Sequence, residues 1–262
     1  MRVSAIQMNM EFEAPDKNFK KAEKLIRAAA KENPDTIVLP ETWNTGFFPS
    51  NNAKELSDKN GKNTIELLSR LAKELNVNIV GGSVVNEKEG GIYNTSYIFN
   101  RKGECIAEYD KTHLFSYMHE DDHFIKGNRV TTFELDGVKC GIIICYDVRF
   151  LELIRTLTLQ GIKVLFVVAQ WPVPRIKHWE ILNTARAIEN QIFNVCVNSC
   201  GTAGETIYAG HSALIDPWGE IIVKASDKEE IITGDLDLEV VDKIRNTINV
   251  YNDRRTELYK LD

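Results

Sequence analysis

The chain has 262 residues, of which 43% are hydrophobic and 27% are charged, and its formal net charge is −6. This composition is typical of globular proteins, and the acidic balance argues against nucleic acid or an anionic membrane surface as the main partner. No apolar run in the sequence approaches the roughly 20 residues of a membrane-spanning helix. The opening segment also lacks the long apolar stretch of a signal peptide, so we expect a cytoplasmic protein.

The five cysteines stand at positions 105, 140, 145, 196 and 200. They form no Cys-x-x-Cys pair, and no histidine stands at zinc-ligand spacing from them. Reduced thiols in a reducing compartment are the simplest interpretation for four of the five. We therefore predict no metal site and no cofactor.

Strand and helix patterns alternate along almost the whole chain. Short apolar runs indicate strands, and apolar residues that recur every three or four positions indicate helices. In chain order, the predicted elements are a strand at Val3–Met8, a helix at Asp16–Glu32, a strand at Thr36–Leu39, a helix at Asn63–Leu75, strands at Asn78–Val85, Ile92–Phe99, Glu104–Tyr109, Thr131–Leu135 and Val138–Ile144, a helix from near Asp147, a strand at Lys163–Ala169, a helix over about His178–Gln191, strands at Phe193–Asn198, Ser212–Ile215, Glu220–Ala225 and Ile231–Asp237, and a short helix from near Glu239.

The order of these elements predicts an α/β fold. No linker, low-complexity segment or internal repeat interrupts the pattern, so we expect one domain over residues 1–262. The many hairpins, such as the one that Asp136-Gly137 predicts, indicate mixed rather than purely parallel sheets. Two layers of sheet between layers of helix would use this many strands.

Two reactive side chains directly follow predicted strands. Glu41 comes after an apolar strand that Pro40 ends, and Lys111 follows the strand that ends at Tyr109. Strand ends are the usual place for function in α/β proteins. A solvated surface position is nevertheless the commoner environment for either residue, so neither indicates a site by itself.

Cys145 stands where a hydrophobic strand runs directly into a predicted helix, which Asp147 can cap. Free N–H groups and the positive end of a helix dipole at such a turn favour thiolate over thiol. A cysteine in an apolar strand is more often part of the core, and the following helix distinguishes Cys145 from the other four. Cys200, before Gly201, is its only rival.

A thiolate nucleophile needs a base to accept its proton and a cation to stabilise the oxyanion that forms. Glu41, Lys111 and Cys145 supply these groups without a metal. Their long spacing leaves it open from chemistry alone whether they meet in space.

Three segments in this order, LPETWNTGF, EYDKTHLF and CYDVRF, resemble the signature blocks of the carbon–nitrogen hydrolase (nitrilase) superfamily. The similarity extends from the opening strand to GHSALIDPWGE and DLDLE. The resemblance implies a four-layer α-β-β-α sandwich with mixed sheets. It also implies a small-molecule amide as the substrate and a homodimer that forms through helices.

The same resemblance implies roles for individual residues. Glu41 matches the general base, Lys111 the oxyanion-stabilising lysine and Cys145 the nucleophile, with the backbone N–H of Tyr146 completing the oxyanion hole. Glu120 matches a second glutamate of many members.

Two points qualify this match. Asp121 and Asp122 stand beside Glu120, and a solvated acidic loop is the alternative interpretation of the segment. Leu151 replaces a proline that is common in the family after the cysteine block. That position lies early in a helix, where proline is tolerated rather than required.

The segments AQWPVPR, HWEILNTARAIENQ and AGHSALIDPWGE resemble the omega-amidase group, which acts on 2-oxoglutaramate and 2-oxosuccinamate. The alternatives are a deaminated-glutathione amidase, an aliphatic nitrilase, a carbamoyl hydrolase, a thiol peroxidase and a catalytically silent binding module on the same fold.

A substrate of the omega-amidase kind carries a carboxylate away from its amide. The Trp-Pro-x-Pro-Arg segment cannot continue as a strand or helix, so we expect a stiff loop there. Arg175 could clamp the carboxylate with two hydrogen bonds, or could instead meet a carboxylate of the protein surface. Trp171, His178 and Trp179 could border the same pocket.

Overall fold

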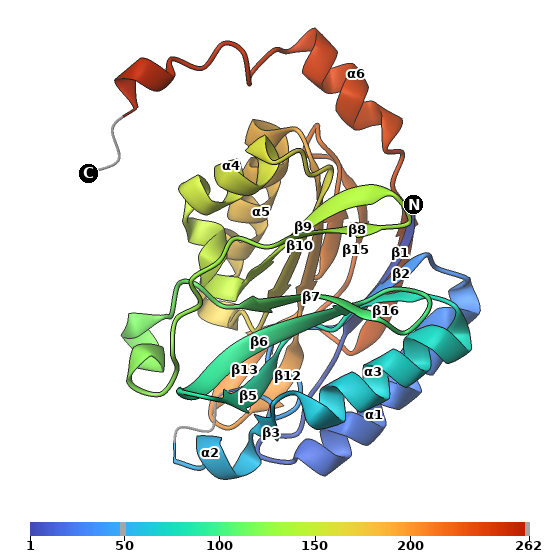
Figure 1. Cartoon of the computed structure of the whole chain (residues 1–262), viewed down its shortest axis with the longest axis vertical. Helices are drawn as coiled ribbons and strands as arrows, with labels where there is room; N and C mark the ends of the chain where they lie inside the picture. Colours follow the sequence, from blue (N-terminus) through green and yellow to red (C-terminus); the bar gives the residue numbers. More distant parts are fainter. Residues whose placement is uncertain (48–50, 260–262) are drawn as a thin grey trace.

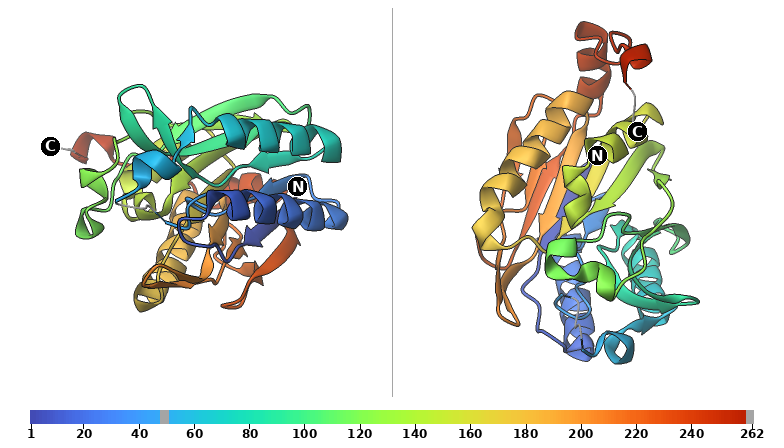
Figure 2. Two further views of the ribbon diagram at one scale, coloured as in Figure 1. Left: turned by 90° about the horizontal axis from the view of Figure 1, so that it is seen from below. Right: turned by 90° about the vertical axis from the view of Figure 1, so that its left-hand side faces the viewer.

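In the computed structural model, which describes residues 1–47 and 51–259, two β-sheets lie face to face and helices cover their outer sides (Figures 1 and 2). The first sheet has the strand order β16-β1-β2-β4-β6-β5-β3, and β7 also pairs with β6. Its strands are β1 (Arg2–Gln7), β2 (Thr36–Val38), β3 (Asp58–Lys59), β4 (Asn78–Val80), β5 (Val84–Lys88), β6 (Gly91–Phe99), β7 (Cys105–Asp110) and β16 (Glu230–Asp235).

The second sheet has the order β15-β14-β11-β10-β9-β8. Its strands are β8 (Thr132–Leu135), β9 (Val138–Ile144), β10 (Val164–Ala169), β11 (Phe193–Asn198), β14 (Ala213–Ile215) and β15 (Ile221–Lys224). A separate hairpin joins β12 (Cys200–Ala203) to β13 (Thr206–Ala209). In the first sheet β1, β2 and β4 are parallel and β16 and β6 pair antiparallel with them; in the second sheet β9, β10 and β11 are parallel and β8 and β14 pair antiparallel with them. The sheets are therefore mixed, as predicted.

The helices are α1 (Pro15–Ala29), α2 (Ala53–Leu56), α3 (Lys62–Leu75), α4 (Leu151–Leu159), α5 (Ile176–Asn190) and α6 (Glu239–Thr247). Helices α1 and α3 pack on the first sheet, and α4 and α5 pack on the second. Within the described ranges, no helix is both long and apolar enough to cross a membrane.

A hydrophobic core lies between each pair of adjacent layers. The central core joins the two sheets through buried residues such as Val3, Val38 and Ile98 from the first and Ile142, Val164 and Phe166 from the second. A second core joins α1 and α3 to the first sheet, and a third joins α4 and α5 to the second. Because helix, sheet, sheet and helix each share a core with the next layer, the expected α-β-β-α sandwich is confirmed.

The prediction of one continuous strand at Asn78–Val85 is wrong. The chain forms β4 and β5 there, separated by Gly81, Gly82 and Ser83. Gly82 has a φ of +61°, and a Cβ on it would lie 2.0 Å from the carbonyl oxygen of Pro40. The strand breaks at this point because the segment that carries the catalytic-site candidate Glu41 passes directly against it.

The prediction of a helix from near Asp147 is also inaccurate. A 3₁₀ turn, η4 (Cys145–Arg149), comes first, and α4 begins only at Leu151. The carboxylate of Asp147 does not cap α4 and instead accepts a hydrogen bond from the N–H of Ile144 at 3.0 Å. The β12–β13 hairpin was not predicted, because both strands have only four residues and β12 consists mainly of small residues that give no strand pattern.

We expect Gly82→Ala to lower the free energy of unfolding by about 3 kcal/mol or more, because it combines a left-handed φ with a backbone clash. The matched control is Gly137→Ala, where φ is +80° but a Cβ would meet nothing within 4 Å. Its cost should be limited to backbone strain, about 1–2 kcal/mol. Urea denaturation of both variants measures the difference, and equal losses would contradict the prediction.

Candidate active site

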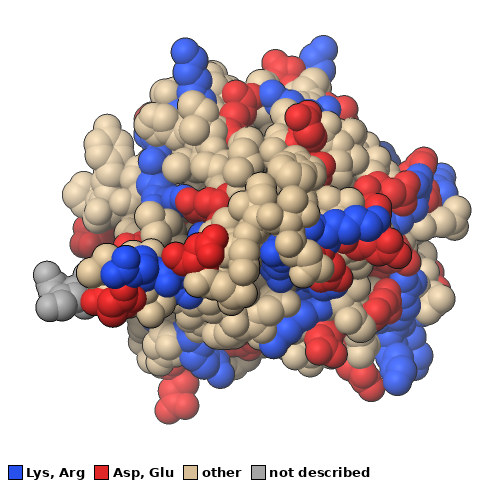
Figure 3. All heavy atoms as spheres, turned by 90° about the horizontal axis from the view of Figure 1, so that it is seen from above, with Lys and Arg blue, Asp and Glu red and all other residues tan. Residues whose placement is uncertain are grey.

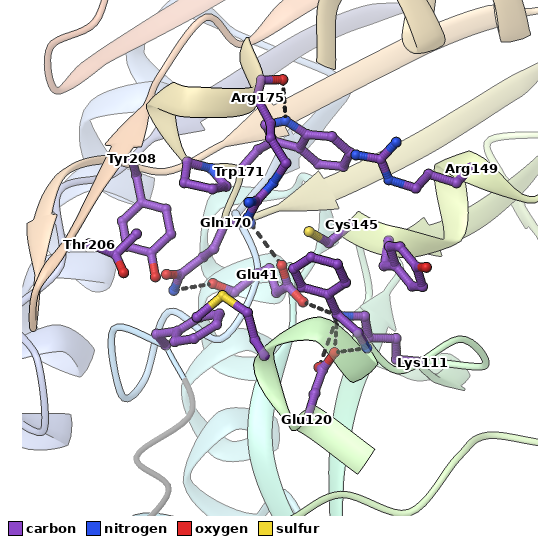
Figure 4. A pocket seen from close by; sticks show the side chains of 15 residues that line it. Glu41, Lys111, Glu120, Cys145, Arg149, Gln170, Trp171, Arg175, Thr206 and Tyr208 are labelled. Atoms are coloured by element: carbon purple, nitrogen blue, oxygen red, sulfur yellow. Dashed lines mark hydrogen bonds and ion pairs between the residues drawn. The ribbon is translucent and has the colours of Figure 1, made fainter. Parts of the chain in front are cut away.

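A pocket of about 460 Å³ opens where strands of both sheets end (Figure 4). Four of the elements that lead into it are β2, β7, β9 and β10, which are followed by Glu41, Lys111, Cys145 and Gln170. The pocket is lined by Glu41, Phe47, Lys111, Phe115, Met118, Glu120, Cys145, Tyr146, Arg149, Gln170, Trp171, Pro172, Arg175, Thr206 and Tyr208. The structure therefore brings together the reactive side chains that the three sequence blocks had singled out.

Glu41 is only 2% exposed, and its carboxylate is held from three sides. Its Oε1 accepts hydrogen bonds from Lys111 Nζ at 2.9 Å and from Asn94 Nδ2 at 2.8 Å. Its Oε2 accepts a hydrogen bond from the backbone N–H of Gln170 at 2.8 Å. Asn94 and Gln170 were not among the predicted site residues.

Lys111 lies between two carboxylates and is 3% exposed. Its Nζ is 2.9 Å from Glu41 Oε1 and 2.9 Å from each carboxylate oxygen of Glu120. Burial alone would lower the pKa of Lys111, but the charges of Glu120 and Glu41 outweigh it and raise the pKa well above its usual value. The two carboxylates therefore favour the charged form of Lys111.

Glu120 lies in a 3₁₀ turn, η3 (Glu120–Asp122), and is the buried acid of its segment. Its Oε2 also accepts a hydrogen bond from the N–H of Phe115 at 2.7 Å. Asp121 and Asp122 are exposed and do not line the pocket. Burial raises the pKa of Glu120, and the neighbouring Lys111 opposes that rise.

Cys145 has a φ of +48°, a left-handed conformation that is uncommon for a residue with a side chain. Figure 4 shows its sulfur facing the carboxylate of Glu41. Burial of the thiol, followed by the charge of Glu41, raises the pKa of Cys145 well above its usual value, and Lys111 only partly opposes this. The expectation that a helix start would favour the thiolate is therefore wrong: α4 begins six residues later, at Leu151, and burial and Glu41 favour the thiol.

Asp147 connects the strand end before the cysteine to the segment after Lys111. It is fully buried, and its carboxylate accepts hydrogen bonds from Tyr109 Oη at 2.7 Å and from the N–H of His113 at 2.9 Å. The same carboxylate holds the N–H of Ile144. This contact joins a strand of each sheet, so it fixes the nucleophile relative to the cation.

The expected substrate-binding residues divide into two groups. Trp171 and Arg175 line the pocket, and the indole N–H of Trp171 donates to the carbonyl oxygen of Arg175 at 2.7 Å. The structure does not place His178 or Trp179 on the pocket wall. His178 is exposed on α5, and Trp179 is buried in the core beneath that helix.

Arg149 is a second cation of the pocket that the sequence interpretation missed. Its guanidinium lies 4.9 Å from the ring centre of Trp171, and that of Arg175 lies 5.2 Å from the ring centre of Phe115 (Figure 4). Within the part of the chain that the structure describes, neither guanidinium forms an ion pair with a carboxylate. Burial lowers the pKa of Arg149. Arg149 stands four residues after Cys145, in CYDVRF, and this position in the cysteine block could have identified it as a pocket residue.

This arrangement can perform acyl transfer through a cysteine. It offers a thiol, a carboxylate beside the thiol and a fixed ammonium. The backbone N–H of Tyr146 is also available, because it lies at the start of a 3₁₀ turn and no carbonyl of that turn accepts it. Across residues 1–47 and 51–259, no group of three or more His, Cys, Asp or Glu side chains could hold a metal ion.

We expect Lys111→Met to lower the free energy of unfolding by about 3–5 kcal/mol near neutral pH, because it leaves two buried carboxylates without their cation. Burial would then raise the pKa of Glu120 without opposition, so the folded state would bind a proton more tightly than the unfolded state. The loss of stability should therefore grow as the pH rises from about 4 to 8.

Thermal unfolding of the variant across this pH range measures the effect. Lys88→Met is the matched control, because Lys88 also bridges two carboxylates, Glu108 and Asp110, but lies nearer to solvent. Its loss should be smaller and nearly independent of pH. A pH-independent loss in Lys111→Met would contradict the prediction.

Comparison with known proteins is consistent with this geometry. The carbon–nitrogen hydrolase family model matches residues 2–246. A 2-oxoglutaramate amidase from Bacillus subtilis (strain 168) is 42% identical, over 98% of each chain. Omega-amidase NIT2 from Xenopus tropicalis is 33% identical, over 94% of this chain and 92% of its own. A CN-hydrolase superfamily protein from Xanthomonas campestris has a TM-score of 0.91 at 28% identity, covering 100% of this chain and 99% of its own. The chain therefore belongs to the carbon–nitrogen hydrolase family, the nitrilase superfamily.

Proposed function

We propose that this chain is an amidase that hydrolyses the omega-amide of a short 2-oxo acid, such as 2-oxoglutaramate, to the acid and ammonia. The observation that carries the proposal is the meeting of Cys145, Glu41, Lys111 and Glu120 at one pocket that also contains Arg149 and Arg175. The names of the relatives at 42% and 33% identity support this substrate class.

The first half of the reaction forms a thioester. Glu41 accepts the proton of the Cys145 thiol, and the sulfur attacks the amide carbon, so that a C–S bond forms and the carbonyl π electrons move to oxygen. Lys111 and the N–H of Tyr146 stabilise that oxyanion. Its collapse breaks the C–N bond, and the proton held by Glu41 passes to the leaving nitrogen, which departs as ammonia.

The second half consumes water. Glu41 accepts a proton from a water molecule that attacks the thioester carbon, and the same two donors stabilise the second oxyanion. Collapse breaks the C–S bond, and the thiolate of Cys145 recovers its proton from Glu41. Glu120 orients Lys111 throughout, because it contacts Nζ with both carboxylate oxygens.

The two arginines support the choice of a substrate with a remote carboxylate. Arg149 and Arg175 lie on the wall beside Trp171, on the side of the pocket away from Lys111 and Glu120 (Figure 4). A guanidinium binds a carboxylate with two parallel hydrogen bonds, and both arginines are partly shielded from water, which strengthens such a pair.

A thiol peroxidase is a poorer match to the site. Peroxidatic cysteines act as thiolates with a lowered pKa, whereas burial and Glu41 raise the pKa of Cys145 here. A silent binding module would have no need for a thiol beside a base and a buried ammonium.

We further propose a homodimer and a reducing, cytoplasmic location. Apolar side chains on the outer helices α4 and α5 are exposed, including Leu151, Leu159, Ile181 and Ile188, as at surfaces that associate. The five cysteines are free thiols. On the face in Figure 3, basic and acidic side chains are interspersed, which supports a small-molecule rather than a nucleic-acid partner.

We expect the wild-type protein to release ammonia from 2-oxoglutaramate, and Cys145→Ala to lose this activity while remaining folded. Cys200→Ala is the matched control, because Cys200 is a buried thiol that does not line the pocket. It should retain activity within about 3-fold, since its replacement touches no reacting group. An active Cys145→Ala, or a dead but folded Cys200→Ala, would refute the assignment of the nucleophile.

We expect Arg175→Ala to reduce kcat/KM for 2-oxoglutaramate by about 10-fold or more, because an ion pair with the remote carboxylate is lost. Hydrolysis of an uncharged amide such as hexanamide should be little affected. Lys177→Ala, at an exposed position in the first turn of α5, controls for a loss of general positive charge. Equal losses on both amides would show that Arg175 supports its segment rather than binding the carboxylate.

A further inference from the structure

Asn94 contacts both the candidate base and the candidate cation, although it lies in β6 outside the three sequence blocks. It is 1% exposed. Its side-chain Nδ2 donates to Glu41 Oε1 at 2.8 Å, and its backbone carbonyl accepts the N–H of Lys111 at 2.9 Å. One residue therefore fixes the side chain of Glu41 and the backbone position of Lys111.

The hydrogen bonds to Glu41 determine which of its oxygens is available. A carboxylate has about four acceptor positions, two on each oxygen. On Oε1, both positions are taken, by Lys111 Nζ and Asn94 Nδ2. On Oε2, one position is taken by the N–H of Gln170. With respect to the described residues, a single acceptor position remains, and it is on Oε2.

The carbonyl oxygen of the Asn94 side chain, Oδ1, also bears on the function of this residue. Among the described residues, Asn94 Oδ1 has no hydrogen-bond partner although it is buried. An unpaired buried acceptor costs about 1–3 kcal/mol. Rotating the amide by 180° would place this oxygen against the Glu41 carboxylate, where both groups are acceptors. The observed orientation therefore keeps the hydrogen bond from Nδ2 to Glu41 and leaves Oδ1 unpaired.

We propose that Asn94 is a positioning residue that, by filling the second acceptor position of Glu41 Oε1, directs proton transfer to Oε2. The proton of the Cys145 thiol then passes to Oε2 as the C–S bond forms, and passes from Oε2 to the leaving nitrogen as the C–N bond breaks. This inference rests on the proposed amidase function and assigns a path to its proton.

The proposal predicts a change in pH dependence. The titratable groups around Glu41 are Lys111 after β7, Glu120 in η3, Cys145 in η4 and Tyr208 on β13. Loss of the Asn94 donor destabilises the unprotonated, charged form of this cluster. The acidic limb of kcat/KM must therefore move to higher pH, because more of the base is protonated at a given pH.

Asn94→Ala removes the donor, and Asn94→Asp replaces it by a second carboxylate of the same size. We expect kcat to fall about 10-fold or more with KM changed less than about 3-fold, and the acidic limb to move up by about half a pH unit in Asn94→Ala and about one in Asn94→Asp. Asn86→Ala is the matched control. Asn86 is a buried asparagine of β5 that bonds to Tyr97 and Gly61, away from the pocket.

The rate of alkylation of Cys145 by iodoacetamide, measured across the same pH range, needs no substrate and separates the two hypotheses. If the wild-type protein hydrolysed no amide, the proposed function would fail, whereas an upward shift of the alkylation profile in both Asn94 variants would still support the role of Asn94. Folded variants whose profiles coincide with that of the wild type, or match that of Asn86→Ala, would overturn it. Unfolding of both variants would assign Asn94 to the sheet and would also count against it.

Discussion

The active site depends on one buried ammonium held between two buried carboxylates. Lys111 contacts Glu41 and Glu120 at 2.9 Å, and all three side chains are almost completely removed from water. Charges can be buried only when they are paired and hydrogen-bonded. The three residues come from separate segments, after β2, after β7 and in η3, and the first sheet, which contains both β2 and β7, brings these segments together. The charged cluster therefore forms only when the chain is folded.

The net charge of this cluster explains why a neutral thiol is the appropriate resting state. One ammonium and two carboxylates give the cluster a net charge of −1, and a thiolate would make that charge −2 in a poorly polarisable environment. When the proton moves from Cys145 to Glu41, the sum remains −1. The negative charge then passes from sulfur to the oxyanion beside Lys111. Charge is therefore moved through the site during the reaction and is never created within it, which keeps the electrostatic cost of each step low.

Hydrophobic periodicity predicted most of the strands, because it is a local pattern, and the resemblance to the nitrilase superfamily implied the four side chains that meet at the pocket. Contacts that depend on pairing between distant strands could not be predicted in this way. Asn94 lies in a polar stretch of β6 with no motif, and its contact with Glu41 forms only when the sheet brings β6 to the segment that follows β2. The raised pKa of Cys145 was missed because burial outweighs the effect of a turn start. His178 was placed at the pocket by its nearness in sequence to Arg175, but α5 directs it to solvent.

The order of strands in the first sheet also bears on how the chain is made. β1 is flanked by β2 and by β16, so residues 2–7 pair with residues 230–235. While the ribosome is still adding the intervening residues, one edge of β1 has no partner, and unpaired strand edges invite association with other chains. The first strand to be synthesised is thus among the last to be enclosed, and a cell making this protein must keep that edge protected until translation has nearly finished.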